Sequence, residues 1–150
     1  MSRINYKVIK NTEGINELCF NYSENSTEAQ AILDFINGRQ LKLVGRLDGA
    51  EFVINPDDIL YIEIVDDKTF AYTKSRVLQL NMGLREVEEY LNSVKYFRCS
   101  KSMIVNIDKV ETLKSLSSNR IDAVLENGEH IIISRTYASD FRKVIRGDYE

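Results

Sequence analysis

Short strand-like runs, each closed by turn-forming residues, are the feature that most constrains how this chain can fold. From Arg39 onward, apolar and β-branched residues recur with the period of a strand. The strongest run, Ile59 to Val65, lies between the turn-like clusters Asn55–Asp58 and Asp66–Lys68. Further runs cover residues 41–47, 52–54, 69–73, 76–80, 110–116, 120–125 and 130–134. Runs this short and this numerous predict a mainly β fold.

Helical patterns are few and short. Leu84, Val87 and Leu91 recur at helical spacing, and similar patterns cover residues 29–36 and 137–145. Asn127-Gly128, the strongest hairpin signal in the chain, separates the last two strand-like runs. The segment Tyr96–Asn106 is rich in apolar residues but follows neither period. We therefore expect many short strands with three short helices.

Residues 1–38 are expected to form an N-terminal segment that precedes a domain at residues 39–148. Two short strands are expected at Ile4–Ile9 and Leu18–Tyr22, followed by a helix. Residues 24–28 offer N-cap side chains for this helix, and Asn37-Gly38 offers a C-cap. A segment below about 40 residues rarely holds a core alone, so it must pack on the rest of the chain or on a second copy. This strand-strand-helix segment is our candidate for a dimerisation or regulatory surface.

The cysteine and histidine inventory argues against several kinds of site. The chain has two cysteines, Cys19 and Cys99, and one histidine, His130. Tetrahedral zinc sites usually need four such ligands, and nothing else in the sequence nominates His130 as a catalytic base. We expect no enzymatic activity, no metal and no cofactor. Two cysteines so far apart are typical of free thiols in a reducing compartment.

Apolar runs are too short for a membrane segment. The longest are Leu60–Ile62, Met103–Val105 and Ile131–Ile133, whereas a spanning helix needs roughly 20 apolar residues. No apolar stretch of signal-peptide length follows the basic N-terminus. We expect a cytoplasmic protein.

Charge is divided unevenly along the chain. The formal net charge is −3, from 20 Lys and Arg against 23 Asp and Glu. Residues 1–66 hold 6 basic and 11 acidic residues, whereas residues 67–146 hold 14 basic and 10 acidic ones. Several basic residues of the second part, among them Lys68, Lys101 and Arg135, lie at expected strand ends. Such residues are typical phosphate and base-edge readers, although solvated surface charges give the same pattern.

Four motifs, in order from Arg39 to Ile145, resemble the LytTR family of bacterial DNA-binding domains. Asp57–Glu63 is similar to the family's strand that ends in an aromatic residue, an apolar residue and Glu. Leu84–Leu91 is similar to its short helix. Phe97–Asn106 is similar to the signature F-R-x-[SH]-[KRN]-S-x-[IV]-V-N. Asn127–Tyr137 is similar to the pattern N-G-x-x-[IV]-x-[IV]-S-R-x-Y. Four motifs in register are far more specific than any one of them.

The resemblance implies a mainly β sheet or sandwich domain of the LytTR type, with short helices. Loops, rather than a recognition helix, would enter successive grooves of double-stranded DNA. It implies DNA contacts in three places: the turn at 66–69, the loop at 98–102 and the Ser134-Arg135 pair. The residues expected to bind DNA are Lys68, Thr69, Arg98, Ser100, Lys101, Ser102 and Arg135. Asp66 and Asp67 depart from the family pattern, and their carboxylates would repel phosphate.

The resemblance also implies a function, that of a sequence-specific transcriptional regulator with no small-molecule substrate. This chain is similar to the stand-alone subgroup, which lacks a receiver domain. A small membrane protein is often the regulatory partner in that subgroup. One small domain offers limited area for specific binding, so we expect a homodimer on repeated half-sites.

Alternatives remain open at this point. The domain could be a protein-interaction module of the same fold without DNA binding. A hydrolase that uses His130 is the least favoured alternative. Arg98 could contact DNA or brace the backbone, and Ser100 and Ser102 could cap their turn instead of touching DNA. Cys99 could be a reactive thiol, although a small packing residue fits better. We read Asn106 as a structural turn residue and His130 as an exposed or cross-strand residue.

Overall fold

The computed structural model describes residues 20–22, 26–36, 41–91 and 95–147. The chain divides into two units, residues 1–40 and residues 41–150, and each is described by itself. None of the helices in the described ranges is long and apolar enough to cross a bilayer.

The first unit contains helix α1 (Thr27–Ile36), which confirms the helix expected there. The Ala29 N–H donates to Ser26 Oγ at 3.1 Å, so Ser26 acts as the N-cap. The strand expected at Leu18–Tyr22 is not formed in its described part, because residues 20–22 pair with no neighbouring strand. There the rings of Phe20 and Tyr22 stack with centroids 5.6 Å apart. The strand expected at Ile4–Ile9 and the C-cap at Asn37-Gly38 lie outside the described residues.

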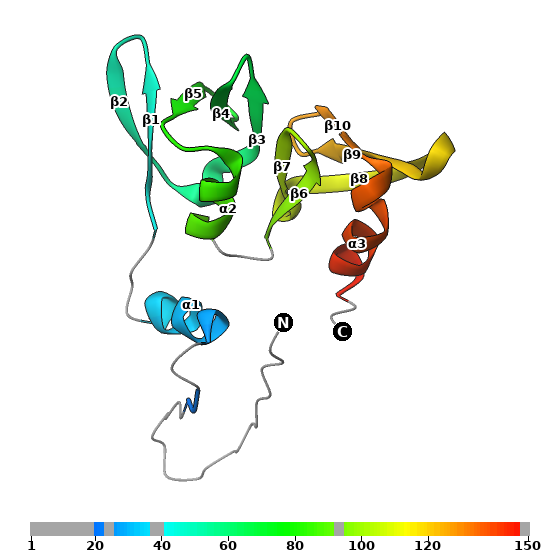
Figure 1. Cartoon of the computed structure of the whole chain (residues 1–150), viewed down its shortest axis with the longest axis horizontal. Helices are drawn as coiled ribbons and strands as arrows, with labels where there is room; N and C mark the ends of the chain where they lie inside the picture. Colours follow the sequence, from blue (N-terminus) through cyan, green and yellow to red (C-terminus); the bar gives the residue numbers. More distant parts are fainter. Residues whose placement is uncertain (1–19, 23–25, 37–40, 92–94, 148–150) are drawn as a thin grey trace. The chain divides into compact units, whose positions relative to one another are not determined.

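The second unit is built on two antiparallel sheets, which confirms the mainly β fold (Figure 1). The large sheet has the strand order β2-β1-β5-β4-β3-β7-β6, and the small sheet has the order β10-β9-β8. The strands of the large sheet are β1 (Leu43–Leu47), β2 (Ala50–Ile54), β3 (Ile59–Val65), β4 (Lys68–Thr73), β5 (Val77–Leu80), β6 (Tyr96–Ser100) and β7 (Met103–Asn106). Those of the small sheet are β8 (Val110–Leu116), β9 (Arg120–Leu125) and β10 (His130–Ile133).

Helices are few in this unit, as the sequence predicts. They are α2 (Leu84–Leu91) and α3 (Arg135–Arg146), with 3-10 turns η1 (Pro56–Asp58), η2 (Ile107–Lys109) and η3 (Ser117–Asn119). In Figure 1, β6 and β7 lie between the rest of the large sheet and the small sheet. The β6–β7 hairpin therefore joins the two halves of the unit.

Strand β3 is buried on both faces because it serves two cores. Ile62 packs in a first core with Val87 and Leu91 of α2. Tyr61 packs in a second core with Ile133 of β10 and Phe141 of α3. A strand buried on both faces has a nearly continuous apolar sequence, which explains the uninterrupted run that the sequence shows here.

The β3–β4 turn uses residues in the left-handed region. Asp66 and Asp67, between β3 and β4, have φ values of 48° and 60°. Positive φ at both central residues matches the twist of the flanking strands, and Asp accepts this conformation better than most residues. The two acidic residues that depart from the family pattern therefore suit the backbone of their turn.

Asn106 holds the end of β7, as the sequence interpretation proposed. It is fully buried; its Nδ2 donates to the carbonyl oxygen of Ile59 at 2.8 Å, and its Oδ1 accepts from the Asp108 N–H at 3.1 Å. One side chain thus fixes the start of β3 and caps η2.

We predict that Asn106→Ala lowers the free energy of unfolding by about 2–3 kcal/mol, because it leaves the buried Ile59 carbonyl without this donor. Urea unfolding followed by circular dichroism measures this change. The exposed Asn81 is the matched control, and Asn81→Ala should change stability by less than about 0.5 kcal/mol. Equal effects of the two substitutions would contradict the role given to Asn106.

Candidate nucleic-acid interface

The segment Tyr96–Asn106, which follows neither period in the sequence, is the β6–β7 hairpin. The register shifts between Arg98 and Ser100, so Cys99 has no partner residue on β7. Such a bulge adds one residue to a strand and reverses the alternation of its side chains, which hides the strand period. The expected loop at 98–102 is therefore corrected: residues 98–100 belong to β6, and only Lys101 and Ser102 form the turn.

The β6–β7 turn lies beside the end of β3. Glu63 of β3 pairs with Met103 of β7, and the Ile64 N–H donates to the carbonyl oxygen of Ser102 at 2.8 Å. The two strands are antiparallel, so the β3–β4 turn and the β6–β7 turn lie at the same end of the sheet.

The start of α3 is tied to the same hairpin. The Ser134 N–H donates to the carbonyl oxygen of Cys99 at 2.9 Å, across the bulge. Arg135 is the first residue of α3 and therefore lies next to the hairpin rather than in a free loop. The structure thus brings the three places expected to contact DNA to one end of the large sheet.

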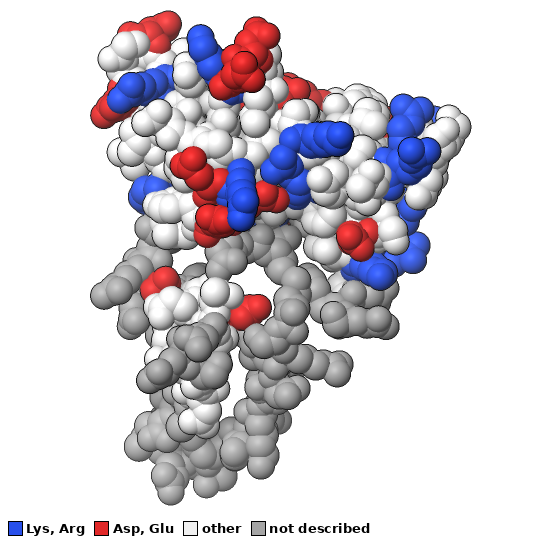
Figure 2. Space-filling view, in the orientation of Figure 1, with Lys and Arg blue, Asp and Glu red and all other residues white. Residues whose placement is uncertain are grey.

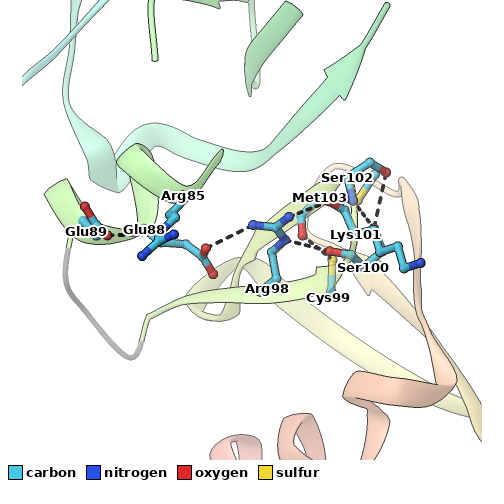
Figure 3. A network of polar contacts seen from close by, with 9 residues as sticks. All are labelled: Arg85, Glu88, Glu89, Arg98, Cys99, Ser100, Lys101, Ser102 and Met103. Atoms are coloured by element: carbon cyan, nitrogen blue, oxygen red, sulfur yellow. Dashed lines mark hydrogen bonds and ion pairs between the residues drawn. The ribbon is translucent and has the colours of Figure 1, made fainter. Parts of the chain in front are cut away.

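Three cations at this end have no side-chain partner in the described part of the chain. Lys68, Lys101 and Arg135 are exposed, and none of them forms a side-chain hydrogen bond or ion pair with any residue in the described ranges. Figure 3 shows the side chain of Lys101 extending away from its turn. We name these three residues the free cations.

Several cations elsewhere in the unit are neutralised by carboxylates. Lys95 Nζ forms ion pairs with Asp57 and Asp108, at the end of β3 that lies away from the free cations. Lys74 and Lys109 both contact Glu126 Oε1, at 3.0 Å and 3.3 Å. The hydrogen bond from Lys74 is the main reason that the pKa of Glu126 is lowered.

Lys and Arg side chains are not evenly spread over the surface. Figure 2 shows them gathered mostly over the β6–β7 hairpin, the small sheet and α3. Acidic side chains in the same view lie mostly over α2, the β1–β2 hairpin and the turn between β3 and β4. The division that the sequence shows along the chain is thus also a division on this face.

The other expected contact residues have structural partners. Arg98 Nε donates to the carbonyl oxygen of Ser100 at 2.8 Å, Nη2 donates to that of Lys101, and Nη1 donates to Glu88 Oε2 at 3.0 Å (Figure 3). The Ser102 N–H donates to Ser100 Oγ at 3.2 Å. These bonds fit the alternative in which Arg98 and Ser100 brace the turn. No local sequence pattern points to Glu88, which is ten residues from Arg98 on the polar face of a helix.

Thr69 differs from the expectation more than any other contact residue. It is only 5% exposed, because it lies on the inner side of β4 and pairs with Ile64 and Leu80. In this conformation it presents almost no surface to DNA. Lys68, one residue earlier, is exposed at the same turn.

Cys99 is a packing residue and His130 is an exposed cross-strand residue, as the sequence interpretation favoured. Cys99 is fully buried in the second core, and this burial raises the pKa of its thiol to about 12. A thiol with this pKa carries almost no thiolate at neutral pH, so it is a packing residue. His130 is exposed, with Nδ1 2.9 Å from Asp122 Oδ2 on the neighbouring strand β9. No cluster of three or more potential metal ligands occurs in the part of the chain that the structure describes.

Comparisons with known proteins agree on one family. The model of the LytTr DNA-binding domain matches residues 50–146. The sensory transduction protein LytT of Bacillus cereus is 26% identical over 105 residues, which are 70% of this chain and 43% of that protein. The transcriptional regulatory protein YpdB of Escherichia coli K12 is 24% identical over 109 residues, 71% of this chain and 45% of that protein. The chain thus spans less than half the length of these relatives.

A solved structure shares the fold. The LytTr DNA-binding domain of a Bacillus cereus protein superposes with a TM-score of 0.66, at 24% sequence identity. The match covers 69% of this chain and 95% of the solved domain. At this identity the match establishes the architecture of the second unit.

Proposed function

This chain belongs to the LytTr DNA-binding domain family, and on that premise we propose that it is a transcriptional regulator that binds double-stranded DNA. The contact surface is the end of the large sheet where the β3–β4 turn, the β6–β7 turn and the start of α3 come together. In this proposal the three elements enter successive grooves of the DNA.

The free cations carry this proposal. Lys68, Lys101 and Arg135 come from three different elements, lie at one end of the sheet and form no ion pair within the described residues. An unpaired cation at a partner surface is most useful where the partner is a polyanion. Arg can bond two acceptors of a guanine at once, so Arg135 is the proposed base reader. Lys101 and Lys68 are proposed to bind phosphates and fix the register.

The proposed binding unit is a homodimer on repeated half-sites. Specific recognition of DNA generally buries about 1,000–2,500 Å² of protein, which is a large area for one small domain with three contact elements. The N-terminal segment at residues 1–38 is the proposed dimerisation or regulatory surface.

A protein-interaction module without DNA binding is the competing function. The net charge of −3 favours it, and so do Asp66 and Asp67, because two carboxylates at the proposed contact surface repel phosphate. Their positive φ values give both residues a structural reason to be there, which weakens this argument.

We predict that Arg135→Ala and Lys101→Ala each weaken DNA binding without unfolding the protein. The probe is a duplex selected by the parent protein from a random pool, with affinity measured by fluorescence anisotropy. Loss of a base-reading Arg should cost about 5- to 100-fold and relax specificity at one position. Loss of a phosphate-binding Lys should reduce the slope of log affinity against log salt by about 0.9.

Lys74→Ala is the matched control for these variants. Lys74 is also an exposed lysine in a turn, but it pairs with Glu126 at the other end of β4. It should bind DNA like the parent. If Lys74→Ala weakens binding while Arg135→Ala and Lys101→Ala do not, the surface is assigned to the wrong end of the sheet.

We also predict that replacing Asp66 and Asp67 by Asn strengthens DNA binding by about two- to fivefold at low salt, and less at high salt. Asn accepts positive φ as Asp does, so the turn keeps its shape while two negative charges disappear. Asp48→Asn is the control, because Asp48 has a φ of 51° in the β1–β2 turn, which is outside the proposed surface. An unchanged affinity of the Asp66→Asn, Asp67→Asn variant would show that this turn stays away from DNA.

A further inference from the structure

We propose that Glu88 of α2 positions the DNA-reading turn by acting through Arg98, and that Arg98 holds this turn without touching DNA. This inference rests on the proposed function, since it concerns how Lys101 is presented to DNA. It assigns a role to α2, a helix that contributes no residue to the expected contact surface.

All three nitrogens of the Arg98 guanidinium donate hydrogen bonds. Nε and Nη2 donate to two consecutive carbonyl oxygens, those of Ser100 and Lys101, and Nη1 donates to Glu88 Oε2 at 3.0 Å. Figure 3 shows the side chain between α2 on one side and the turn on the other. A planar fork with fixed donor directions can hold two carbonyls and a carboxylate together, which a lysine ammonium cannot do with the same geometry.

Glu88 is suited to hold this guanidinium in place. Its helix is fixed in the first core by the buried residues Leu84, Val87 and Leu91. The side chains of Arg98 and Glu88 are 24% and 35% exposed, so water screens their interaction only in part. A charge-assisted hydrogen bond donated to a carboxylate on a fixed helix therefore favours one position of the guanidinium over free motion in solvent.

The backbone of the turn is consequently held from two sides. Arg98 binds the carbonyl oxygens of Ser100 and Lys101, and on the other side the Ile64 N–H binds that of Ser102. The Lys101 side chain has no such partner among the described residues. A free side chain on a fixed backbone loses less entropy on binding than one on a mobile turn. Loss of Glu88 should therefore weaken DNA binding although Glu88 does not contact the DNA.

The test uses the full chain with two DNA probes, the duplex selected by the parent and a scrambled duplex of the same length. Glu88→Gln should bind the selected duplex about fivefold more weakly, because a neutral amide accepts a weaker hydrogen bond. Its salt slope should equal that of the parent, because no phosphate contact is lost. Its affinity for the scrambled duplex should fall by a similar factor, because the phosphate contact proposed for Lys101 does not depend on sequence.

Glu89→Gln is the matched control. Glu89 is the next residue of the same helix, and it pairs with Arg85 on the exposed face, where its side chain is 69% exposed. It should bind the selected duplex like the parent. Equal weakening by Glu88→Gln and Glu89→Gln would mean that only the overall charge of α2 matters, and the proposal would fail.

Arg98 variants separate positioning from direct contact. Arg98→Lys keeps the charge but not the fork, so it should weaken binding with the parent's salt slope. If Arg98 touches a phosphate, Arg98→Lys should instead keep most of the affinity and Arg98→Ala should lower the slope by about 0.9. Adding Glu88→Gln to Arg98→Ala should cost nothing further, because Glu88 acts only through Arg98. Additive losses would overturn the inference.

The proposed function and this inference can fail separately. A parent protein that selects no duplex would refute DNA binding itself. A parent that binds its selected duplex while Glu88→Gln binds it equally well would refute only the role of Glu88. Thermal unfolding of each variant shows whether a loss of binding comes from loss of the fold.

Discussion

The hydrogen bond from the Ser134 N–H to the Cys99 carbonyl is the interaction on which the rest of the surface depends. The bulge in β6 removes Cys99 from the β6–β7 register, and its carbonyl meets the residue before α3 instead. The thiol of Cys99 packs in the second core with Phe141 of α3, so the helix is held by both backbone and side chain. Without this junction, Arg135 would have no fixed place beside the β6–β7 turn.

Charge pairing distinguishes the cations at the two ends of β3 and β4. At the far end of β3 and β4, Lys74 and Lys109 share the carboxylate of Glu126, and Lys95 forms ion pairs with two others. Lys68 and Arg135, at the other end, are left unpaired among the described residues. The net charge of −3 averages over this arrangement, and it therefore says little about what one end of the sheet can bind.

The sequence predicted the elements better than their contacts. The apolar run of β3, the Asn127-Gly128 hairpin and the three helices follow from local patterns, and the structure confirms them. The β6–β7 hairpin was missed because a bulge reverses side-chain alternation within a short strand. Thr69 was expected to contact DNA because the family resemblance implies contacts at the turn at 66–69, but its neighbours in the sheet bury it. The partnership of Glu88 with Arg98 depends on tertiary packing, which no local pattern reports.

A nuclear magnetic resonance titration of the full chain with its selected duplex tests the central claim, that one end of the large sheet binds DNA. The account predicts that the largest changes in amide shift or line width fall at residues 66–69, 100–102 and 134–136, from all three elements together. Amides of the β4–β5 turn at 74–76 and of η1 at 56–58, at the other ends of β4 and β3, should change little. Larger changes at 74–76 and 56–58 than at the three proposed elements would contradict the account.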